Sequence, residues 1–391
     1  MEYITFNNDW SEENQVAIGR LYAYFQTVPD NRNAQGKRYP LAYLLIVIVL
    51  AKLAGEQKPA GIKDWIHLRW RGLMGAFACH WPPVPGLNTI RRTLADAVAA
   101  AELKKVCNQF LYEEYGGQQE EQIVIDGKTL RGTIAKGCSQ GVHQLTAYLP
   151  EEGVALDQEV VANKENELVA APKLLARLAL SKKVVCGDAM FTQRNLSVQI
   201  MAQGGDYLWF VKDNQPTLHE DVQRFFAAPD VRAGWYREKL PQTCAQTIDK
   251  GHGRVETRTL TAVPDTTEYL NWPGAQQVFK LERTATDQRT NVRREETVFG
   301  LTSLTSEEAD AEHLLTLVRR MWGIENGLHR RRDTTLQEDS IRMIHTGQAE
   351  AVAILHNFIS SLLSKLGFSN HASAIRQFNA AIDRTLLLNF L

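Results

Sequence analysis

Two aspartates follow short apolar runs that resemble each other. Asp126 comes directly after the run 122–125, three of whose four residues are β-branched, and Gly127 follows it. Asp188 comes after the run 183–186 and is preceded by Gly187. Runs of this kind are typical of buried strands. In an open α/β sheet, ligands bind at strand ends, and glycine lets the backbone approach a ligand closely. We therefore expect both aspartates at the ends of core strands in one sheet.

Paired carboxylates at that place would suit a divalent cation. Neighbouring strands lie about 4.8 Å apart, so two strand-end carboxylates can share one ion. Mg²⁺ prefers oxygen ligands and typically takes only one or two carboxylates from a protein, together with substrate phosphates. Two such ions can activate a hydroxyl and stabilise the leaving oxygen of a phosphodiester. Bound cations would also keep both carboxylates ionised despite their mutual repulsion.

A third acid is expected from the C-terminal part of the chain. Glu325 is the best candidate, because it lies on a predicted helix among phosphate-binding side chains: Arg319, Arg320, His329 and Arg332. By spacing alone, three other acids remain alternatives: Asp333, Glu338 and Asp339.

The elements that would position these acids follow from hydrophobic periodicity. Residues 1–115 read as a helical N-terminal domain with apolar segments at 41–53, 61–70 and 88–110, and they are a candidate DNA-binding region. Asn88 and Thr89 are a plausible N-cap, and Arg91 and Arg92 then lie on the first turn, facing either DNA phosphates or solvent.

The rest of the chain alternates between strand and helix patterns. Residues 120–212 predict the first part of a mixed sheet with packed helices, including a hairpin of 143–149 and 153–161, helices at 168–178 and 193–203, and a strand at 207–211. Residues 213–304 predict a β-rich insertion, with strands near 255–262, 277–284 and 294–301. Residues 305–391 predict C-terminal helices, at 307–328 and 348–365.

Composition narrows the class of protein. The chain has 391 residues, which favours two or three domains. Its net charge is -1, so any nucleic-acid contact must depend on local charge. The five cysteines are dispersed without a CxxC pair, which favours a reducing cytoplasm and argues against structural zinc. The most apolar run, 41–50, is about half the length a membrane-spanning helix needs, so we expect a buried helix and no membrane partner.

Several motifs together resemble the H-repeat-associated family of bacterial insertion-sequence transposases, a group within the DDE transposases. They extend from about residue 20 to 365 in one order: 28–32 with 36–41, Ile125-Asp126-Gly127-Lys128-Thr129-Leu130-Arg131-Gly132, Lys164-Glu165-Asn166-Glu167, Gly187-Asp188-Ala189-Met190-Phe191-Thr192-Gln193, Val211-Lys212-Asp213-Asn214-Gln215-Pro216, 252–258 and Trp322-Gly323-Ile324-Glu325-Asn326.

The resemblance implies an RNase H-like fold with a β insertion between the second and third acids. It implies that Asp126, Asp188 and Glu325 are the catalytic and metal-binding residues. It implies two Mg²⁺ or Mn²⁺ ions as the cofactor. It also implies cleavage and strand transfer of double-stranded DNA, at the terminal inverted repeats of a mobile element and at a target. By analogy with recombinases that bridge DNA, we expect a homodimer on DNA.

Basic and polar residues near these motifs are candidate DNA contacts. They are Lys128, Arg131, Lys212, Asn214, His252, Arg254, Arg319, Arg320, His329, Arg330, Arg331 and Arg332. The run 330–332 departs from the family, which usually has aromatic and apolar residues there. That departure leaves two alternatives open: a catalytically silent DNA-binding descendant, or a nuclease that cuts without joining.

Overall fold

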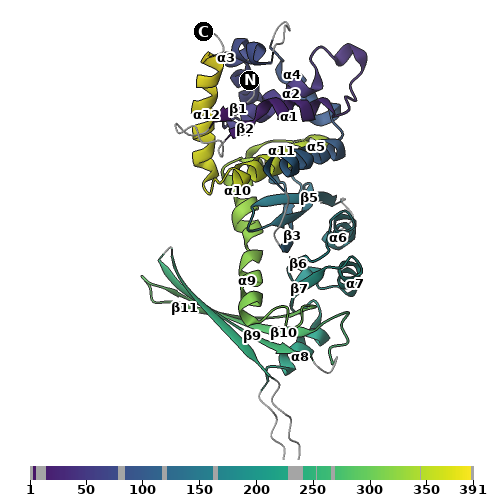
Figure 1. Cartoon of the computed structure of the whole chain (residues 1–391), viewed down its shortest axis with the longest axis vertical. Coiled ribbons are helices and arrows are strands. Elements are labelled where there is room, and N and C mark those ends of the chain that lie inside the picture. The colour runs from purple at the N-terminus through teal and green to yellow at the C-terminus, as the bar shows by residue number, and fades with distance from the viewer. Residues whose placement is uncertain are drawn as a thin grey trace, which may run out of the picture. The chain divides into compact units, whose positions relative to one another are not determined.

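A computed structural model describes residues 3–5, 15–77, 84–116, 121–161, 166–227, 241–251, 253–265, 269–343 and 345–388. The chain divides into two compact units (Figure 1). Unit 1 contains residues 1–119, 127–167 and 325–391, and unit 2 contains residues 120–126 and 168–324. The expectations at 81–83, 164–165 and His252 lie outside the described residues.

The N-terminal part of unit 1 is mainly helical, as predicted. A short pair of strands, β1 (Tyr3–Thr5) and β2 (Gln15–Ala17), leads into the helices. These are α1 (Ile18–Gln26), α2 (Leu41–Leu53), α3 (Pro59–Ala76), α4 (Leu87–Arg92) and α5 (Ala100–Tyr115), with a 3-10 turn η2 (Ala34–Gly36) and a π-helical turn η3 (Thr93–Ala97).

Helix α2 is the centre of this part, because every one of its residues from Leu41 to Leu53 is buried. It packs against α1, α3, α11 and α12, which explains why its sequence is apolar on all sides. In the parts of the chain that the structure describes, no helix combines the length and apolarity needed to cross a bilayer.

The remaining elements of unit 1 pack beside these helices. The hairpin of β4 (His143–Leu149) and β5 (Val154–Val161) is antiparallel, as predicted. The C-terminal elements are η6 (Ile324–His329, which begins at the unit boundary), α10 (Arg330–Thr334), η7 (Glu338–Ser340), α11 (Thr346–Lys365) and α12 (His371–Leu388). Helix α11 packs against α5 and β5, so it joins the helical part to the hairpin.

Unit 2 is built on a large mixed sheet. The order of its strands is β3-β6-β7-β11-β10-β9-β8, in which β3–β6 and β6–β7 pair in parallel and the other pairs are antiparallel. The bounds are β3 (Gln122–Thr129, of which the first five residues belong to unit 2), β6 (Val184–Gly187), β7 (Asp206–Val211), β8 (Thr243–Gly251), β9 (Arg254–Pro264), β10 (Gln277–Asp287) and β11 (Arg293–Thr302).

Helices cover this sheet on both sides. Figure 1 shows α6 (Glu167–Leu175) and α7 (Arg194–Ala202) beside β6 and β7, with α9 (Ala311–Met321) on the opposite side. Gln122 at the start of β3 donates from Nε2 to the Leu317 carbonyl of α9 at 2.7 Å. Helix α8 (Pro216–Arg224) packs against β11, and a 3-10 turn η5 (Ala189–Phe191) follows β6.

Four sequence expectations differ from the structure. The helix predicted at 307–328 is interrupted, because α9 ends at Met321 and the π-helical turn η6 begins at Ile324. Strand β3 continues to Thr129, so Asp126 lies inside the strand and not at its end. Helix α4 begins at Leu87 after Gly86 without a side-chain cap, so the predicted Asn88–Thr89 cap is wrong. The segment 88–110 is not one helix, because Val98 adopts an extended backbone (φ -119°, ψ 127°) that separates η3 from α5.

The β-rich region contains one strand more than the sequence pattern predicted. Its predicted strands are present as β9, β10 and β11, and β8 is an additional strand that the sequence pattern did not predict. Because β11 pairs with β7 through Phe299↔Val211 to Thr302↔Leu208, these strands extend the same sheet.

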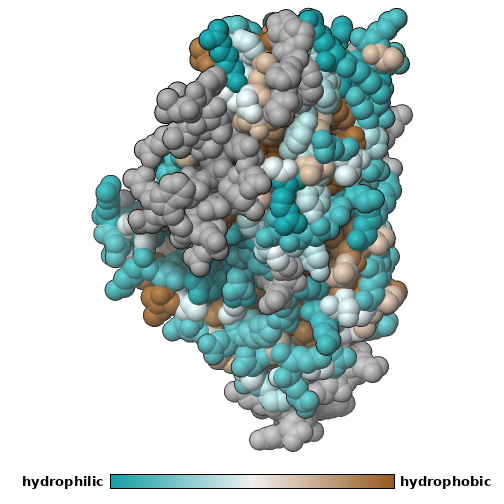
Figure 2. All heavy atoms as spheres, turned by 45° about the horizontal axis from the view of Figure 1, so that its top comes forward, coloured by the Kyte–Doolittle hydropathy of each residue, from teal (hydrophilic) through white to brown (hydrophobic). Residues whose placement is uncertain are grey.

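The surface is mainly polar where Figure 2 colours it. Hydrophobic side chains appear there as separate brown patches among teal ones. Large exposed hydrophobic residues are scattered over several elements, among them Leu68 on α3, Val198 on α7 and Ile248 on β8. Single exposed apolar residues of this kind are ordinary in soluble folds.

Candidate active site

Asp126 lies on β3, and Asp188 lies directly after the neighbouring parallel strand β6 of unit 2. The strand pairs Gln122↔Val184, Ile123↔Val185 and Val124↔Cys186 differ by 62 in residue number, and so do Asp126 and Asp188. Asp188 follows β6 directly and keeps an extended backbone (φ -69°, ψ 177°). Each aspartate is two residues beyond the last of these pairs, so each lies on the same face of its segment as that paired residue, because side chains alternate along a strand.

Glycine and a capping bond hold the second aspartate in place. A Cβ on Gly187 would lie 2.8 Å from Cδ2 of Phe191 and 3.2 Å from Cγ1 of Ile125, so this position accepts no side chain without a shift. Asp188 is exposed, and its Oδ1 accepts a hydrogen bond from the Met190 amide at 2.9 Å. That bond uses one oxygen and leaves the other carboxylate oxygen available to a ligand.

The chemistry of this donor pair fits a hard divalent cation. Two carboxylates on adjacent strands offer oxygen ligands, and Mg²⁺ or Mn²⁺ needs few protein ligands when water and phosphate oxygens complete its shell. In the described ranges, no three or more His, Cys, Asp or Glu residues gather in a group that could hold a metal.

Glu325, the expected third acid, belongs to unit 1. It is exposed and lies in the π-helical turn η6 between α9 and α10. Such turns are rare within helices and occur frequently at functional sites, because the extra residue redirects side chains. Tyr148 of β4 packs closely here, since a Cβ on Gly327 would lie 2.9 Å from its hydroxyl oxygen.

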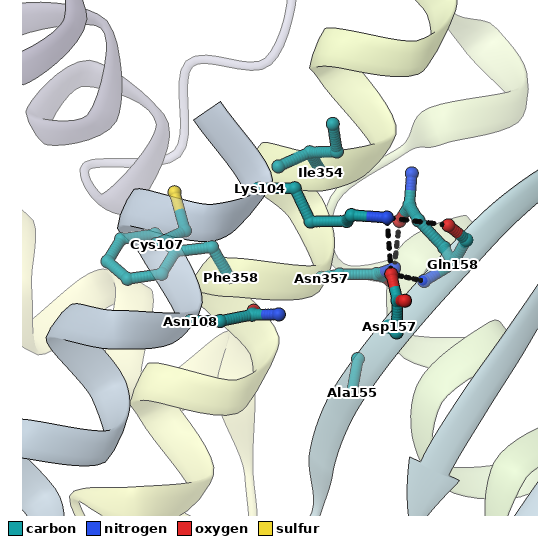
Figure 3. Close-up of a pocket in the computed structure, with 9 residues that line it drawn as sticks. All are labelled: Lys104, Cys107, Asn108, Ala155, Asp157, Gln158, Ile354, Asn357 and Phe358. Atoms are coloured by element: carbon teal, nitrogen blue, oxygen red, sulfur yellow. Dashed lines mark hydrogen bonds and ion pairs between the residues drawn. The ribbon is translucent and has the colours of Figure 1, made fainter. Parts of the chain in front are cut away.

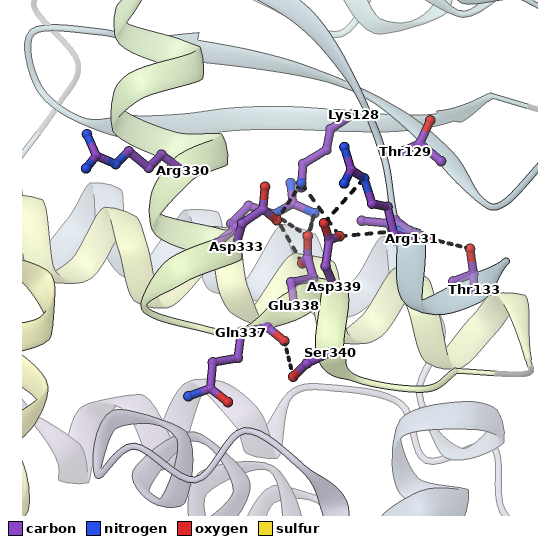
Figure 4. Close-up of polar contacts among 12 residues, drawn as sticks. Lys128, Thr129, Arg131, Thr133, Arg330, Asp333, Gln337, Glu338, Asp339 and Ser340 are labelled. Carbon is purple, nitrogen blue, oxygen red and sulfur yellow. Dashed lines mark hydrogen bonds and ion pairs between the residues drawn. The ribbon is translucent and has the colours of Figure 1, made fainter.

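Lys128 and Arg131 face acids within unit 1 (Figure 4). Lys128 is nearly buried, with Nζ 2.6 Å from Oδ1 of Asp333 and 3.9 Å from Oδ1 of Asp339. Arg131 is exposed, and its Nε lies 3.6 Å from Oδ2 of Asp339. Two of the alternative acids thus serve as partners of basic side chains that the sequence predicted as phosphate contacts.

The third alternative acid, Glu338, is part of the interior. Its carboxylate is fully buried and pairs with Arg332 at 2.9 Å, and His356 Nδ1 donates to it at 2.8 Å. Burial alone would raise the pKa of this carboxyl, but Arg332 and His356 hold its pKa well below the usual range. Glu338 is therefore a structural anion.

The four basic residues at 329–332 have different surroundings. Arg332 is fully buried and also donates to Asn357 and Gln144, which corrects the expectation that it contacts DNA. His329 is buried too, and burial, helped by Arg332, lowers its pKa to about 3, so it carries no charge for a phosphate at neutral pH. Arg331 is half-buried and donates to Ser364 Oγ at 3.1 Å. Arg330 is exposed and points away from the cluster in Figure 4.

Lys212 and Asn214 lie close to Asp188 in unit 2. Both are exposed, and Asn214 Nδ2 donates to the Ala189 carbonyl of η5 at 2.6 Å. They line an open pocket of about 380 Å³ together with Met190 and Gln193. A cation and amide groups beside an exposed carboxylate are suited to a nucleic-acid strand.

The other predicted contacts of unit 2 are spread along the sheet. Arg319 at the end of α9 pairs with Asp249 of β8 at 2.9 Å, and Arg320 is half-buried. Arg254 is exposed at the start of β9.

A polar chain that the sequence did not single out lies beside Gly127. Thr129 Oγ1 is 2.8 Å from His143 Nδ1, and His143 Nε2 is 2.7 Å from Oε1 of Glu167. A Cβ on Gly127 would lie within 2.6 Å of both His143 Nε2 and Glu167 Oε1. Glu167 belongs to the polar turn 164–167 that resembles the transposase motif. This motif is the sequence feature that could have identified the polar chain.

A small cavity between α5, β5 and α11 is not a substrate site (Figure 3). Its volume is about 10 Å³, which is at the lower limit for a single water molecule. Lys104 closes it by pairing with Asp157 and donating to the Gln158 carbonyl at 3.0 Å.

The comparisons with known proteins and the sequence motifs indicate the same family. The model of the "Transposase DDE domain" matches residues 117–363, and the model described as "DDE_Tnp_1-associated" matches residues 22–111. The "Putative transposase YncI" of Escherichia coli O157:H7 is 29% identical over 355 residues, which is 89% of this chain and 88% of that protein. The "H repeat-associated putative transposase YhhI" of Escherichia coli K12 is 25% identical and covers 96% of this chain and 98% of its own length.

Among solved structures, this chain is similar to the piggyBac transposase in its synaptic complex with hairpin DNA, with a TM-score of 0.48 and 10% identity over 95% of this chain and 81% of that one. The domain match at 117–363 covers more than half of the sequence. The chain therefore belongs to the DDE transposase family and is related to its H repeat-associated members.

Proposed function

We propose that this protein is an active transposase that cuts DNA at the ends of an insertion-sequence element and joins those ends to target DNA. The observation that carries the proposal is that Asp126 and Asp188 each lie two residues after the paired residues Val124 and Cys186 of the parallel strands β3 and β6. Family membership supports the reaction class, and we assign the mixed sheet to the RNase H-like type on the same grounds.

Each acidic residue has a role in this proposal. Asp126 and Asp188 would hold Mg²⁺ or Mn²⁺, and Glu325 is proposed as the third ligand. When bound, two such ions would supply Lewis-acid activation of the attacking oxygen and charge stabilisation of the leaving oxygen. Asp188 stays oriented for this task because the Met190 amide holds its Oδ1.

Basic and amide side chains would orient the DNA. Lys212 and Asn214 would hold the strand next to Asp188, and the hydrogen bond from Asn214 to Ala189 keeps their loop against η5. Arg330 and Arg254 are exposed and placed to meet phosphates, whereas Arg131 and Lys128 would exchange Asp339 and Asp333 for phosphate. A homodimer that bridges two DNA ends is part of the proposal.

A strand-transfer assay tests the reaction. The protein is incubated with Mn²⁺ or Mg²⁺, labelled duplexes carrying the repeats that flank the gene, and a supercoiled target plasmid. Asp188→Ala is the test variant, and Glu307→Ala, an exposed acid of the same unit, is the matched control.

Joined products from the parent and from Glu307→Ala, but not from Asp188→Ala, are expected. Cut but unjoined DNA would identify a nuclease instead. Binding without cutting by any of the three proteins would contradict an active enzyme and indicate a silent descendant.

A further inference from the structure

Tyr148 of β4 closes the space beside Gly327, which lies two residues after Glu325 in the turn η6. A Cβ on Gly327 would lie 2.9 Å from the Tyr148 hydroxyl oxygen, which is closer than such atoms normally approach. The next ring atoms, Cζ and Cε1, would lie 3.7 and 3.9 Å away, which are ordinary contacts. The hydroxyl oxygen therefore restricts this position to glycine. All three residues belong to unit 1.

Tyr148 is held firmly in the interior. It has only 1% exposed surface, and a rigid ring in a closely packed interior has little room to move aside. The hairpin that carries it is fixed to α11, because the Ala155 amide donates to Ser361 Oγ at 3.0 Å and Lys365 pairs with Glu152 at 2.5 Å. A group added on the opposite side of the contact would therefore displace η6 and not the tyrosine.

An irregularity of the hairpin sets the direction of this side chain. The register of β4 and β5 shifts between Ala147 and Tyr148, so Leu156 is an extra residue on β5. A bulge of this kind bends the strands and changes the direction in which a side chain points. Asn108 of α5 stabilises the bulge, because its Nδ2 donates to the Leu156 carbonyl at 2.7 Å.

We propose that Tyr148 is a positioning residue for Glu325: its hydroxyl end supports η6 at Gly327 and thereby fixes the direction of the Glu325 carboxylate. Residues two apart in a helical turn face different sides of it. Tyr148 thus supports the turn from behind, while Glu325 remains exposed. The inference rests on the proposed function in one respect, because it takes Glu325 as the third metal ligand.

Such support matters because a metal ligand must be held close to its productive direction. The Glu325 carboxylate is exposed, so the backbone of η6 has to set that direction. Groups that orient the ligands of a metal typically contribute about 10- to 100-fold to metal affinity or activity. The fit between Gly327 and Tyr148 is therefore expected to appear in the affinity for the metal.

A size substitution and its rescue test this fit. Gly327→Ala adds the Cβ that meets the Tyr148 hydroxyl, and Gly327→Ala/Tyr148→Phe removes that hydroxyl again. Gly75→Ala is the matched control, because a Cβ at this exposed glycine of the same unit meets nothing within 4 Å. Mn²⁺ affinity is measured from the EPR signal of the free ion, with duplex DNA carrying the flanking repeats present. Thermal melting of every variant reports the fold.

Gly327→Ala is expected to weaken Mn²⁺ binding about 10- to 100-fold, and the double variant is expected to regain most of the parent affinity. Gly75→Ala should bind Mn²⁺ as the parent does. In a Glu325→Gln background, Gly327→Ala should cause no further loss, because the ligand that it misdirects is already absent. A general folding defect would instead lower the melting temperature and weaken binding in that background too.

Parent-like Mn²⁺ affinity in Gly327→Ala, or no recovery in the double variant, would overturn the inference alone, provided that Glu325→Gln weakens binding. Parent-like affinity in Glu325→Gln, or a parent that binds no Mn²⁺, would reject Glu325 as a ligand and the inference with it. A parent that shows the rescue in Mn²⁺ binding yet neither cuts nor joins DNA would reject the proposed function and keep the inference.

Discussion

Arg332 and Glu338 pair at 2.9 Å with both side chains completely buried. His356 extends the contact, because its Nδ1 lies 2.8 Å from the Glu338 carboxylate and its Nε2 lies 3.0 Å from Lys52 Nζ. A lysine ammonium only donates and a carboxylate only accepts, so His356 must donate through Nδ1 and accept through Nε2. This network links α2 with α10, η7 and α11 inside unit 1. Helix α10 directly follows η6, the turn that contains Glu325.

Removing one member of the buried pair should destabilise the protein strongly. Glu338→Gln leaves the Arg332 guanidinium uncompensated in the interior, and we expect a decrease of about 3–5 kcal/mol in the free energy of unfolding, measured in urea. Arg332→Met/Glu338→Leu should cost less, because no lone charge remains. As a control, Lys63→Ala breaks an exposed pair and should cost less than about 1 kcal/mol. Equal decreases for Glu338→Gln and Lys63→Ala would contradict this assignment.

The same network predicts a stability that rises with pH. Burial lowers the pKa of Lys52 to about 7 and that of His356 to about 4. The unfolded chain therefore binds more protons than the folded chain between about pH 4 and 6.5 through His356, and between about pH 7 and 10.5 through Lys52. Each group should raise the unfolding free energy in its window, by up to about 1.4 kcal/mol per pH unit.

Urea denaturation at a series of pH values measures this dependence. Lys52→Met should remove the rise in unfolding free energy between about pH 7 and 10.5 and keep the rise between about pH 4 and 6.5. A Lys52→Met protein with the parent's dependence above pH 7 would show that Lys52 stays protonated in the fold.

Gly132 is predicted to be intolerant of any side chain. A Cβ there would lie 2.0 Å from the Ile341 carbonyl oxygen, so Gly132→Ala must separate η4 (Arg131–Thr133) from η7. We expect a decrease of about 1–3 kcal/mol in stability by urea denaturation. Gly86→Ala, with open space around its Cβ, is the control and should be nearly neutral. A neutral Gly132→Ala would mean that these two turns are not packed together.

Glu167 is expected to matter for activity more than for stability. It holds His143 at 2.7 Å beside Gly127, the residue after Asp126. Glu167→Ala should lower the rate of DNA cutting at least tenfold, while Glu167→Gln, which can still accept from His143, should recover part of that activity. Melting temperatures close to that of the parent would separate this positioning role from a folding defect. Parent-like cutting by Glu167→Ala would contradict it.

The sequence correctly predicted the helices and strands that have long apolar runs or a strong hydrophobic periodicity. The buried helix 41–53, the hairpin 143–161 and the strands that precede Asp188 and end at Val211 all appear, because long apolar runs leave few alternatives. Strand β8 was missed because its residues are mostly exposed, so they carry no hydrophobic alternation. The break at Val98 was missed because residues on both sides share a helical pattern.

The burial and the partners of the basic side chains were the hardest features to predict from the sequence. Arg330, Arg331 and Arg332 look alike in the sequence, yet only Arg330 is fully at the surface, because Glu338 and Asn357 complete a buried site for Arg332. Lys128 looks like a phosphate contact but already has Asp333 as partner. A local sequence does not reveal such partners, since they come from distant segments.

The most direct test of the central claim is calorimetric titration of Mn²⁺ into four proteins in the presence of duplex DNA: the parent, Asp126→Asn, Asp188→Asn and the double variant. If the two carboxylates share a cation, each single substitution should remove most of the binding free energy, and the double variant should bind only a little more weakly than either single one. Unchanged Mn²⁺ affinity in either single variant, or decreases that simply add, would show that Asp126 and Asp188 do not form one metal site.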